Sequence, residues 1–261
     1  MPLQVSSTTR RGTRRQPEAS RRAILQAALV EFAQEGIAGA RMDAIAAAAG
    51  VNKALLYYYF RDKEALYGAV LDDFFVRLLA RVTKAFDGAG PAGERLLNYA
   101  RAHFDCISES LHYARLFQGE LLSAGRGKPS HLTRVVERYI RPISVRLIAV
   151  LQEGIASGEF RQVDAMQFAP SIAGMIVHYF VVAPVARTLF AIDPFSQQAL
   201  QQRRAAVLDF IAAALFADQS AGVKLAAKVA SRSEAQPEVA SNVAKTSTRR
   251  VRVQGNANEA Q

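Results

Sequence analysis

The sequence predicts an all-α fold, with three short helices followed by about six longer ones. Apolar residues recur every three or four positions from Ser20 to Phe216, which is the spacing of amphipathic helices. No stretch alternates polar and apolar residues in the manner of a β-strand, and glycine or proline separates the periodic segments. Half of the 261 residues are hydrophobic, which is enough to build a sizeable core.

The first three predicted helices are close together in the sequence. One begins at Ser20, a candidate N-cap, and ends at Gly36. Two short helices, at 42–49 and 53–60, are joined by a turn at 50–52. Three helices with such short connections can form one small domain.

A longer helix follows at 63–85 and is closed by a glycine-rich segment at 87–93. This change from short to long helices indicates a small domain followed by a larger one, which we place at 20–66 and 67–217. The other helices of the larger domain are expected at 93–110, 112–124, 129–157, 164–190 and 196–217.

Positive charge is concentrated at both ends of the chain, whose formal net charge is +10. Residues 1–22 hold six arginines and one acidic residue. Few large apolar residues occur in 1–19 or in 218–261, so we expect a disordered basic arm and a disordered basic tail. Such segments favour a polyanionic partner, but alone they would bind it without sequence specificity.

We expect a soluble, cytoplasmic protein without a membrane partner. The most apolar segment is interrupted by His178, Tyr179 and Pro184, and no apolar signal-peptide core follows the N-terminal arginines. Cys106 is the only cysteine, which excludes a disulfide framework and a multi-cysteine zinc site.

The stretch AIAAAAGVNKALLYYYF at 44–60 predicts a helix-turn-helix. Ala46 is small enough to let two helices approach closely, and Gly50 can adopt the left-handed turn between them. Val51 fills the space after the turn, and Leu56 anchors the second helix. These residue types at these spacings are typical of a DNA-binding motif whose second helix enters the major groove.

The outward face of this second helix is the expected DNA contact surface, whereas Tyr59 and Phe60 should face inward. A tyrosine ring can pack on sugars and thymine methyl groups, and its hydroxyl can bind a phosphate. Arg22, in the first turn of the helix predicted from Ser20, is expected to contact phosphate. The candidate DNA-binding residues are Arg22, Arg41, Asp43, Asn52, Lys53, Ala54, Leu55, Tyr57, Tyr58 and Lys63.

Residues 20–66, SRRAILQAALVEFAQEGIAGARMDAIAAAAGVNKALLYYYFRDKEAL, closely resemble the N-terminal domain of TetR-type transcriptional repressors. The resemblance implies a homodimer in which each subunit presents one recognition helix to half of a palindromic operator. It also implies a C-terminal domain that binds a small effector and then releases the DNA.

By this resemblance, Tyr57 and Lys63 match phosphate-contacting positions. Groove-facing positions are matched by Lys53, Ala54, Leu55 and Tyr58. The chain departs from the pattern at Ala40-Arg41-Met42, where a Ser or Thr cap is usual. Arg41 could replace that contact with a charged phosphate contact. Asp43 could favour the helix N-terminus or accept from a cytosine amino group.

In the larger domain we expect an effector cavity and a dimer interface. The resemblance implies an interface at helices 164–190 and 196–217, in a four-helix bundle with a second copy. Their small and apolar stripes suit this, although a single chain could also bury them internally. The effector is not identified by the sequence. The candidate effector-binding residues are His103, Phe104, Ile107, Tyr113, Phe117, Tyr139 and His178.

Four alternatives remain at this point. The regulator could be an activator, because activation or repression depends on operator position. His103 and Cys106 share a helix face and could serve a metal-responsive or thiol-responsive regulator. A sequence-neutral DNA-coating protein would rely on the basic tails. An enzyme is not supported, since no catalytic residues, resident metal site or cofactor motif can be assigned.

Overall fold

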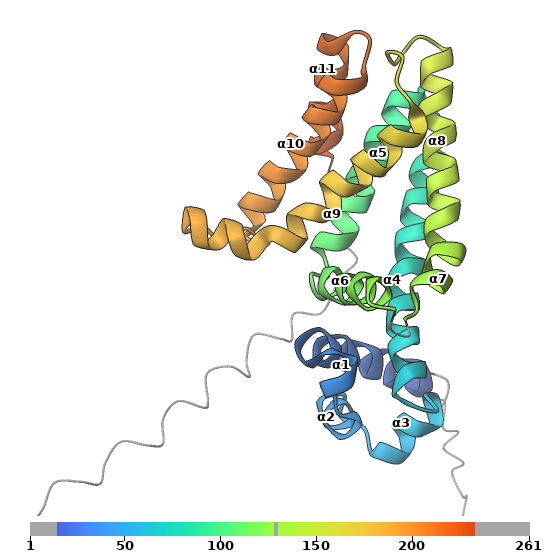
Figure 1. Ribbon diagram of the computed structural model, residues 1–261, viewed down its shortest axis with the longest axis vertical. Helices are drawn as coiled ribbons and strands as arrows, with labels where there is room; N and C mark the ends of the chain where they lie inside the picture. Colours follow the sequence, from blue (N-terminus) through green and yellow to red (C-terminus); the bar gives the residue numbers. More distant parts are fainter. Residues whose placement is uncertain (1–14, 128–129, 233–261) are drawn as a thin grey trace, which may run out of the picture. The chain divides into compact units, whose positions relative to one another are not determined.

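The computed structural model describes residues 15–127 and 130–232, and these are almost entirely helical (Figure 1). The compact unit described below ends at Ala230. Within the described residues the only β-type pairing is an isolated bridge between Phe160 and Phe216, so the all-α prediction is confirmed. The helices are α1 Arg15–Gly39, α2 Met42–Ala48, α3 Lys53–Tyr59, α4 Lys63–Phe86, α5 Ala92–Ser108, α6 His112–Gly125, α7 Leu132–Val135, the π-helical η1 Val136–Ile140, α8 Arg141–Ala156, α9 Ala165–Phe190, α10 Gln197–Leu215 and α11 Gln219–Ser231.

Helix α1 begins earlier than predicted. It begins at Arg15, so residues 15–19 are helical and Ser20 lies inside the helix instead of capping it. Pro17 is tolerated there because the first turn of a helix needs no N–H donor, and its carbonyl accepts a 3.0 Å hydrogen bond from the hydroxyl of Tyr59. The backbone of Gly36 (φ 66°, ψ 173°) is not helical, so the first helical segment ends there as predicted, and a short second segment continues to Gly39. The expected arm at 1–14 lies outside the described residues.

The C-terminal segment also differs from the prediction of a disordered tail, because 219–231 forms α11. Asp218 caps this helix by accepting from the backbone N–H of Ala221 at 3.0 Å. Gly222, Ala226 and Val229 are its buried residues, and this narrow stripe of mostly small side chains gave little apolar signal. The rest of the expected tail, 233–261, lies outside the described residues.

The helix predicted over 129–157 is divided into α7, η1 and α8. Pro142 lies in the first turn of α8. Proline has no backbone N–H, so it cannot make the hydrogen bond that would continue an upstream helix through this position. The π-helical turn of η1 precedes this proline and brings Tyr139 inward.

The turn between α2 and α3 closes as the sequence predicted. The backbone N–H of Val51 donates to the carbonyl of Ala46 at 3.0 Å, and that of Gly50 donates to Ala47 at 3.2 Å. With φ of 67° at Gly50, this is the paired hydrogen-bond pattern of a left-handed helix C-cap. Ala46 and Leu56 are buried at the crossing, so α3 has one inward face and one outward face.

Helix α4 runs from the three-helix unit into the core of the larger domain. Near its start, Tyr67 packs edge-on against Phe32 of α1, with ring centroids 5.0 Å apart. Near its end, Phe86 stacks on Tyr99 of α5 at 4.9 Å. One continuous helix therefore contributes to the cores of both parts.

Helix α9 is long and apolar enough to cross a membrane by length and composition, which the sequence analysis did not expect. Only 28% of its most apolar window is buried. Ile172, Ile176 and Phe180 form its buried side, packed in the core. Most of this apolar window is thus left uncovered by the residues that the structure describes.

Gly154 on α8 provides a test of the core packing. A methyl group at this position would overlap the ring of Phe160, which is buried and packs edge-on against Phe216 at 5.2 Å. We expect Gly154→Ala to lower the unfolding free energy by about 1–3 kcal/mol because the ring must shift. Urea unfolding followed by circular dichroism measures this change.

Gly119→Ala on α6 is the matched control, because nothing lies within 4 Å of the added methyl group. It should stabilise the protein by about 0.5–1 kcal/mol through helix propensity. A similar change in the unfolding free energy of both variants would show that the overlap with Phe160 does not cause the loss of stability.

Candidate nucleic-acid interface and internal cavity

The N-terminal end of α3 is held by two polar contacts. The side chain of Asn52 caps the helix by accepting from the backbone N–H of Leu55 at 2.7 Å. The ammonium of Lys53 lies 2.8 Å from the carboxylate of Asp43 in the first turn of α2. The hydrogen bond and charge of Lys53 hold the pKa of Asp43 below its usual value. Both side chains remain more than half exposed, so this pair is available to a partner.

The outward face of α3 carries unusually exposed aromatic surface. Tyr58 is 80% exposed and Tyr57 is 41% exposed. Ala54 is also exposed, whereas Leu55 is partly buried. Folding alone does not account for so much open tyrosine surface on one short helix.

The inward face of α3 matches the prediction for the two aromatic residues at its end. Phe60 is 5% exposed and lies under the guanidinium of Arg21, 5.5 Å from its ring centroid. Tyr59 is partly buried and reaches Pro17 through its hydroxyl. Both residues join α3 to α1.

The basic residues predicted to contact DNA phosphate differ in whether their side chains are hydrogen-bonded within the protein or exposed. Lys63 donates to the carbonyls of Ala38 and Ala40, each at 3.1 Å, so its ammonium is occupied at the end of α1. Arg22 and Arg41 are exposed. No side chain caps α2 at Arg41, in agreement with the missing Ser or Thr.

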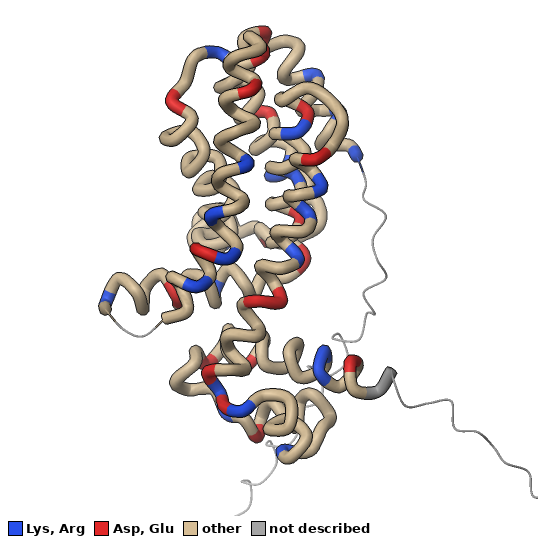
Figure 2. The backbone as a smooth tube through the Cα atoms, turned by 90° about the vertical axis from the view of Figure 1, so that its right-hand side faces the viewer, with Lys and Arg blue, Asp and Glu red and all other residues tan. Residues whose placement is uncertain are grey.

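Charges of both signs are interspersed along the described helices (Figure 2). Charge alone therefore does not mark a nucleic-acid surface on these helices, and the exposed residues of α3 are their more distinctive feature.

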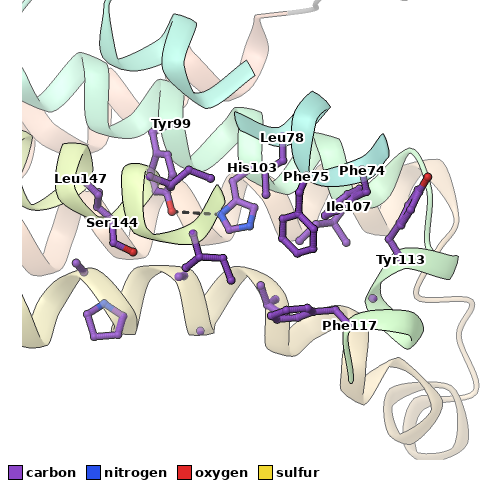
Figure 3. Close-up of a pocket in the computed structure, with 18 of the residues that line it drawn as sticks. Phe74, Phe75, Leu78, Tyr99, His103, Ile107, Tyr113, Phe117, Ser144 and Leu147 are labelled. Carbon is purple, nitrogen blue, oxygen red and sulfur yellow. Dashed lines mark hydrogen bonds between the residues drawn. The ribbon is translucent and has the colours of Figure 1, made fainter. Parts of the chain in front are cut away.

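The larger domain encloses a cavity of about 490 Å³ between α4, α5, α6, α8 and α9 (Figure 3). Four of the predicted effector-binding residues line it: His103, Ile107, Tyr113 and Phe117. Much of the remaining wall was not predicted from the sequence. It includes Phe74, Phe75 and Leu78 of α4, Tyr99 of α5, Ser144 and Leu147 of α8, and Ala173 of α9. The four-residue spacing of Tyr99, His103 and Ile107 is a signal that could have located Tyr99.

Three predicted residues lie away from the cavity wall. Phe104, one position after His103, is turned toward Phe180, with ring centroids 5.1 Å apart. Tyr139 stacks on Phe75 at 5.7 Å and donates to Asp72 at 2.8 Å. His178 is exposed on α9.

Two polar groups of the cavity wall are fixed by neighbours. The hydroxyl of Tyr113 donates to Asp73 at 3.0 Å and lies 3.2 Å from the guanidinium of Arg77. Tyr99 and His103 are joined through the hydroxyl and Nδ1 at 3.2 Å, as Figure 3 shows. Burial lowers the pKa of His103 to about 4, so its ring is neutral at pH 7.

Comparisons with known proteins agree with this architecture. The family described as bacterial regulatory proteins of the tetR family matches residues 24–70, and a tetracyclin repressor-like C-terminal domain matches residues 93–211. The HTH-type transcriptional regulator RutR of Escherichia coli (strain K12) is 33% identical over 180 residues, which cover 69% of this chain and 82% of RutR. The chain belongs to the TetR family.

Other relatives of this TetR-family chain are similar over different lengths. The HTH-type transcriptional repressor SCO4008 of Streptomyces coelicolor is 36% identical over 130 residues, which cover 50% of this chain and 64% of that protein. A solved structure, the putative transcriptional regulator SCO4942 from Streptomyces coelicolor, is 29% identical with a TM-score of 0.54, covering 72% of this chain and 93% of that one. A putative fatty acid metabolism regulator from Clostridium perfringens has the same fold, with a TM-score of 0.58 at 21% identity, 72% of this chain and 97% of that one being covered.

Family membership identifies the class of function. This TetR-family chain is a DNA-binding transcriptional regulator and not an enzyme. The helix-turn-helix of α2 and α3 lies inside the matched N-terminal segment, and most of the cavity-lining residues lie inside the matched C-terminal segment.

The chemistry of Cys106 does not favour the thiol-responsive alternative for this TetR-family regulator. Burial raises the pKa of the Cys106 thiol to about 11, which disfavours the reactive thiolate at pH 7. Within residues 15–127 and 130–232, no three His, Cys, Asp or Glu side chains come together in a group that could hold a metal ion. His103 and Cys106 share a helix, but neither belongs to such a metal-binding group within the described residues.

Proposed function

We propose that this regulator is a cytoplasmic homodimer that represses transcription by binding a palindromic operator through α3 and is released by a small molecule in the α4–α9 cavity. The observation that carries this proposal is the exposed outer face of α3, with Tyr58 at its centre, on a unit that shares α4 with the cavity. Each step has separate support.

On the DNA side, the proposal assigns Tyr57 and Tyr58 to the groove wall and Lys53 to the groove entrance. Their side chains are exposed, and α3 presents its N-terminus first. Asp43 holds Lys53 beside this N-terminus, so its ammonium is already positioned before DNA arrives. Arg22 and Arg41 add exposed cations for phosphate.

For the dimer, the support is uncovered apolar surface on the last helices of the matched domain. Val185, Leu189 and Phe190 on α9 are each more than 60% exposed, and Phe210 on α10 is 60% exposed. Large exposed apolar side chains often mark a protein interface. A four-helix bundle formed with α9 and α10 of a second copy would cover them.

Effector release is supported by two helices, α4 and α6, that each reach from the cavity to the three-helix unit. Phe74 and Phe75 of α4 line the cavity, and the same helix begins beside α1 at Lys63. On α6, Phe117 lines the cavity and Leu116 borders a second hollow together with residues of α1. A ligand that moves α4 or α6 would therefore change the position of α3 relative to that of the second subunit.

Selection from a random duplex pool at physiological salt tests the proposal. The purified chain should enrich an inverted repeat whose half-sites are about one helical turn apart. Sedimentation of the purified chain should show a dimer, and the complex with a selected duplex should contain two chains. Loss of all enrichment, or enrichment of a single half-site by a monomer, would contradict the dimeric operator-binding mechanism.

A further inference from the structure

The cavity wall differs sharply in composition from the rest of the chain. Within the described residues that line it, there is no lysine, arginine, aspartate or glutamate, and aromatic and aliphatic side chains predominate. Tyr113 of the wall contacts two charged side chains, Arg77 and Asp73, through its hydroxyl. These two side chains pair with each other at 3.1 Å. A charged ligand would therefore find no unpaired counter-ion in this wall.

His103 is the exception to this apolar wall. Its side chain lines the cavity although the residue is only 8% exposed, and its ring lies among apolar neighbours such as Phe75 and Ile107 (Figure 3). Nδ1 is occupied by the hydroxyl of Tyr99, and Nε2 has no hydrogen-bond partner within the described residues. Nε2 therefore remains available to a molecule in the cavity, and a bound ligand can supply its hydrogen-bond partner.

The contact with Tyr99 favours one tautomer of the His103 ring. The hydroxyl of Tyr99 has one hydrogen to donate, and Nδ1 of His103 is its only partner within the part of the chain that the structure describes. Burial raises the pKa of this tyrosine, so the hydroxyl stays protonated. When the hydroxyl donates to Nδ1, a neutral imidazole carries its proton on Nε2 and offers an N–H donor to the cavity.

We propose that the effector is an uncharged, mainly apolar molecule with one hydrogen-bond acceptor, such as a ketone, ester or lactone oxygen, that accepts from Nε2 of His103. The assignment rests on the proposed function, because it identifies the ligand class of the same cavity. A carboxylate is disfavoured, since burying it without a free cation carries a large desolvation penalty. The volume of about 490 Å³ suits a small organic molecule.

Calorimetric titration with two probes of equal chain length tests the ligand class. At pH 7.5 we expect 2-undecanone to bind at least tenfold more tightly than undecanoate, because only the ketone avoids burying a charge. Equal or tighter binding of undecanoate, or no measurable binding of 2-undecanone, would overturn the assignment.

Variants of the cavity wall test the role of His103. His103→Leu keeps a similar volume and should weaken 2-undecanone binding about threefold to tenfold, the value of one net hydrogen bond. His103→Gln retains an N–H donor and should recover part of that loss. Ile107→Val, one turn away on α5, is the matched control and should weaken both probes to a similar, smaller extent. Unchanged ketone affinity in His103→Leu, with the variant folded by circular dichroism, would exclude the proposed hydrogen bond.

A DNA-release measurement separates this inference from the proposed function. If 2-undecanone binds through His103 but leaves the selected duplex bound, the ligand class stands and the release step fails. If undecanoate binds more tightly and releases the duplex, the release step stands and the ligand class fails.

Discussion

Lowering the pH from 7.5 to 5.0 should reduce the unfolding free energy by about 2 kcal/mol more in the wild-type protein than in His103→Leu. Burial lowers the pKa of His103 from 6.5 to about 4 in the folded chain. Between these values the unfolded chain binds a proton that the folded chain does not. Stability is therefore unaffected by this group above about pH 6.5, falls as the pH drops below it, and reaches its full loss of about 3 kcal/mol below pH 4.

Urea unfolding at both pH values, in the same buffer and salt, gives the required difference. Comparing the wild type with His103→Leu cancels the contribution of other groups, including His112, whose pKa burial also lowers. The absolute stabilities of the two proteins need not agree, because the substitution also changes packing. An equal acid dependence in both proteins would show that His103 takes up a proton without unfolding.

Tyr58→Ala should reduce affinity for the selected operator by about tenfold to a hundredfold while leaving the melting temperature unchanged. Loss of one good groove contact costs about 1–3 kcal/mol. The folded chain should tolerate the change because Tyr58 is 80% exposed and its one aromatic contact within the described residues is an edge-on approach to Tyr59 at 5.3 Å. Fluorescence anisotropy with the labelled duplex and thermal unfolding measure the two quantities.

Two further variants make this result specific. Tyr58→Phe keeps the ring and removes the hydroxyl, so it separates packing on the groove wall from a bond to phosphate. Val76→Ala removes an exposed apolar side chain from α4, away from α3, and should leave DNA affinity unchanged. A loss of affinity in Val76→Ala equal to that in Tyr58→Ala would remove Tyr58 from the contact surface.

Local patterns in the sequence were sufficient to predict the turn between α2 and α3. Gly50 and Ala46 act through backbone geometry and close approach, which depend on neighbours a few residues away. The start of α1 and the presence of α11 were missed for the opposite reason. Their stability comes from distant contacts, such as the hydroxyl of Tyr59 on Pro17, which spacing within one segment does not reveal.

The cavity was harder to predict than the helix-turn-helix, because its wall depends on which face each helix turns inward. His103 and Phe104 are neighbours in sequence, yet only His103 lines the cavity. Selecting polar and aromatic residues as candidates identified part of α5 and α6 but missed the apolar side of α4. The packing angle of five helices decides these positions, and no single helix contains that information.

The two hydrogen bonds of Lys63 have a mechanical consequence. Its ammonium joins the start of α4 to the carbonyls of Ala38 and Ala40 at the end of α1, where a hinge between the two helices would otherwise be expected. Bending there would require both bonds to break, so we expect the three-helix unit and the first turns of α4 to rotate as one stiff piece. The two recognition helices of a dimer would then keep their shape in every state, and induction would alter only the distance and angle between them.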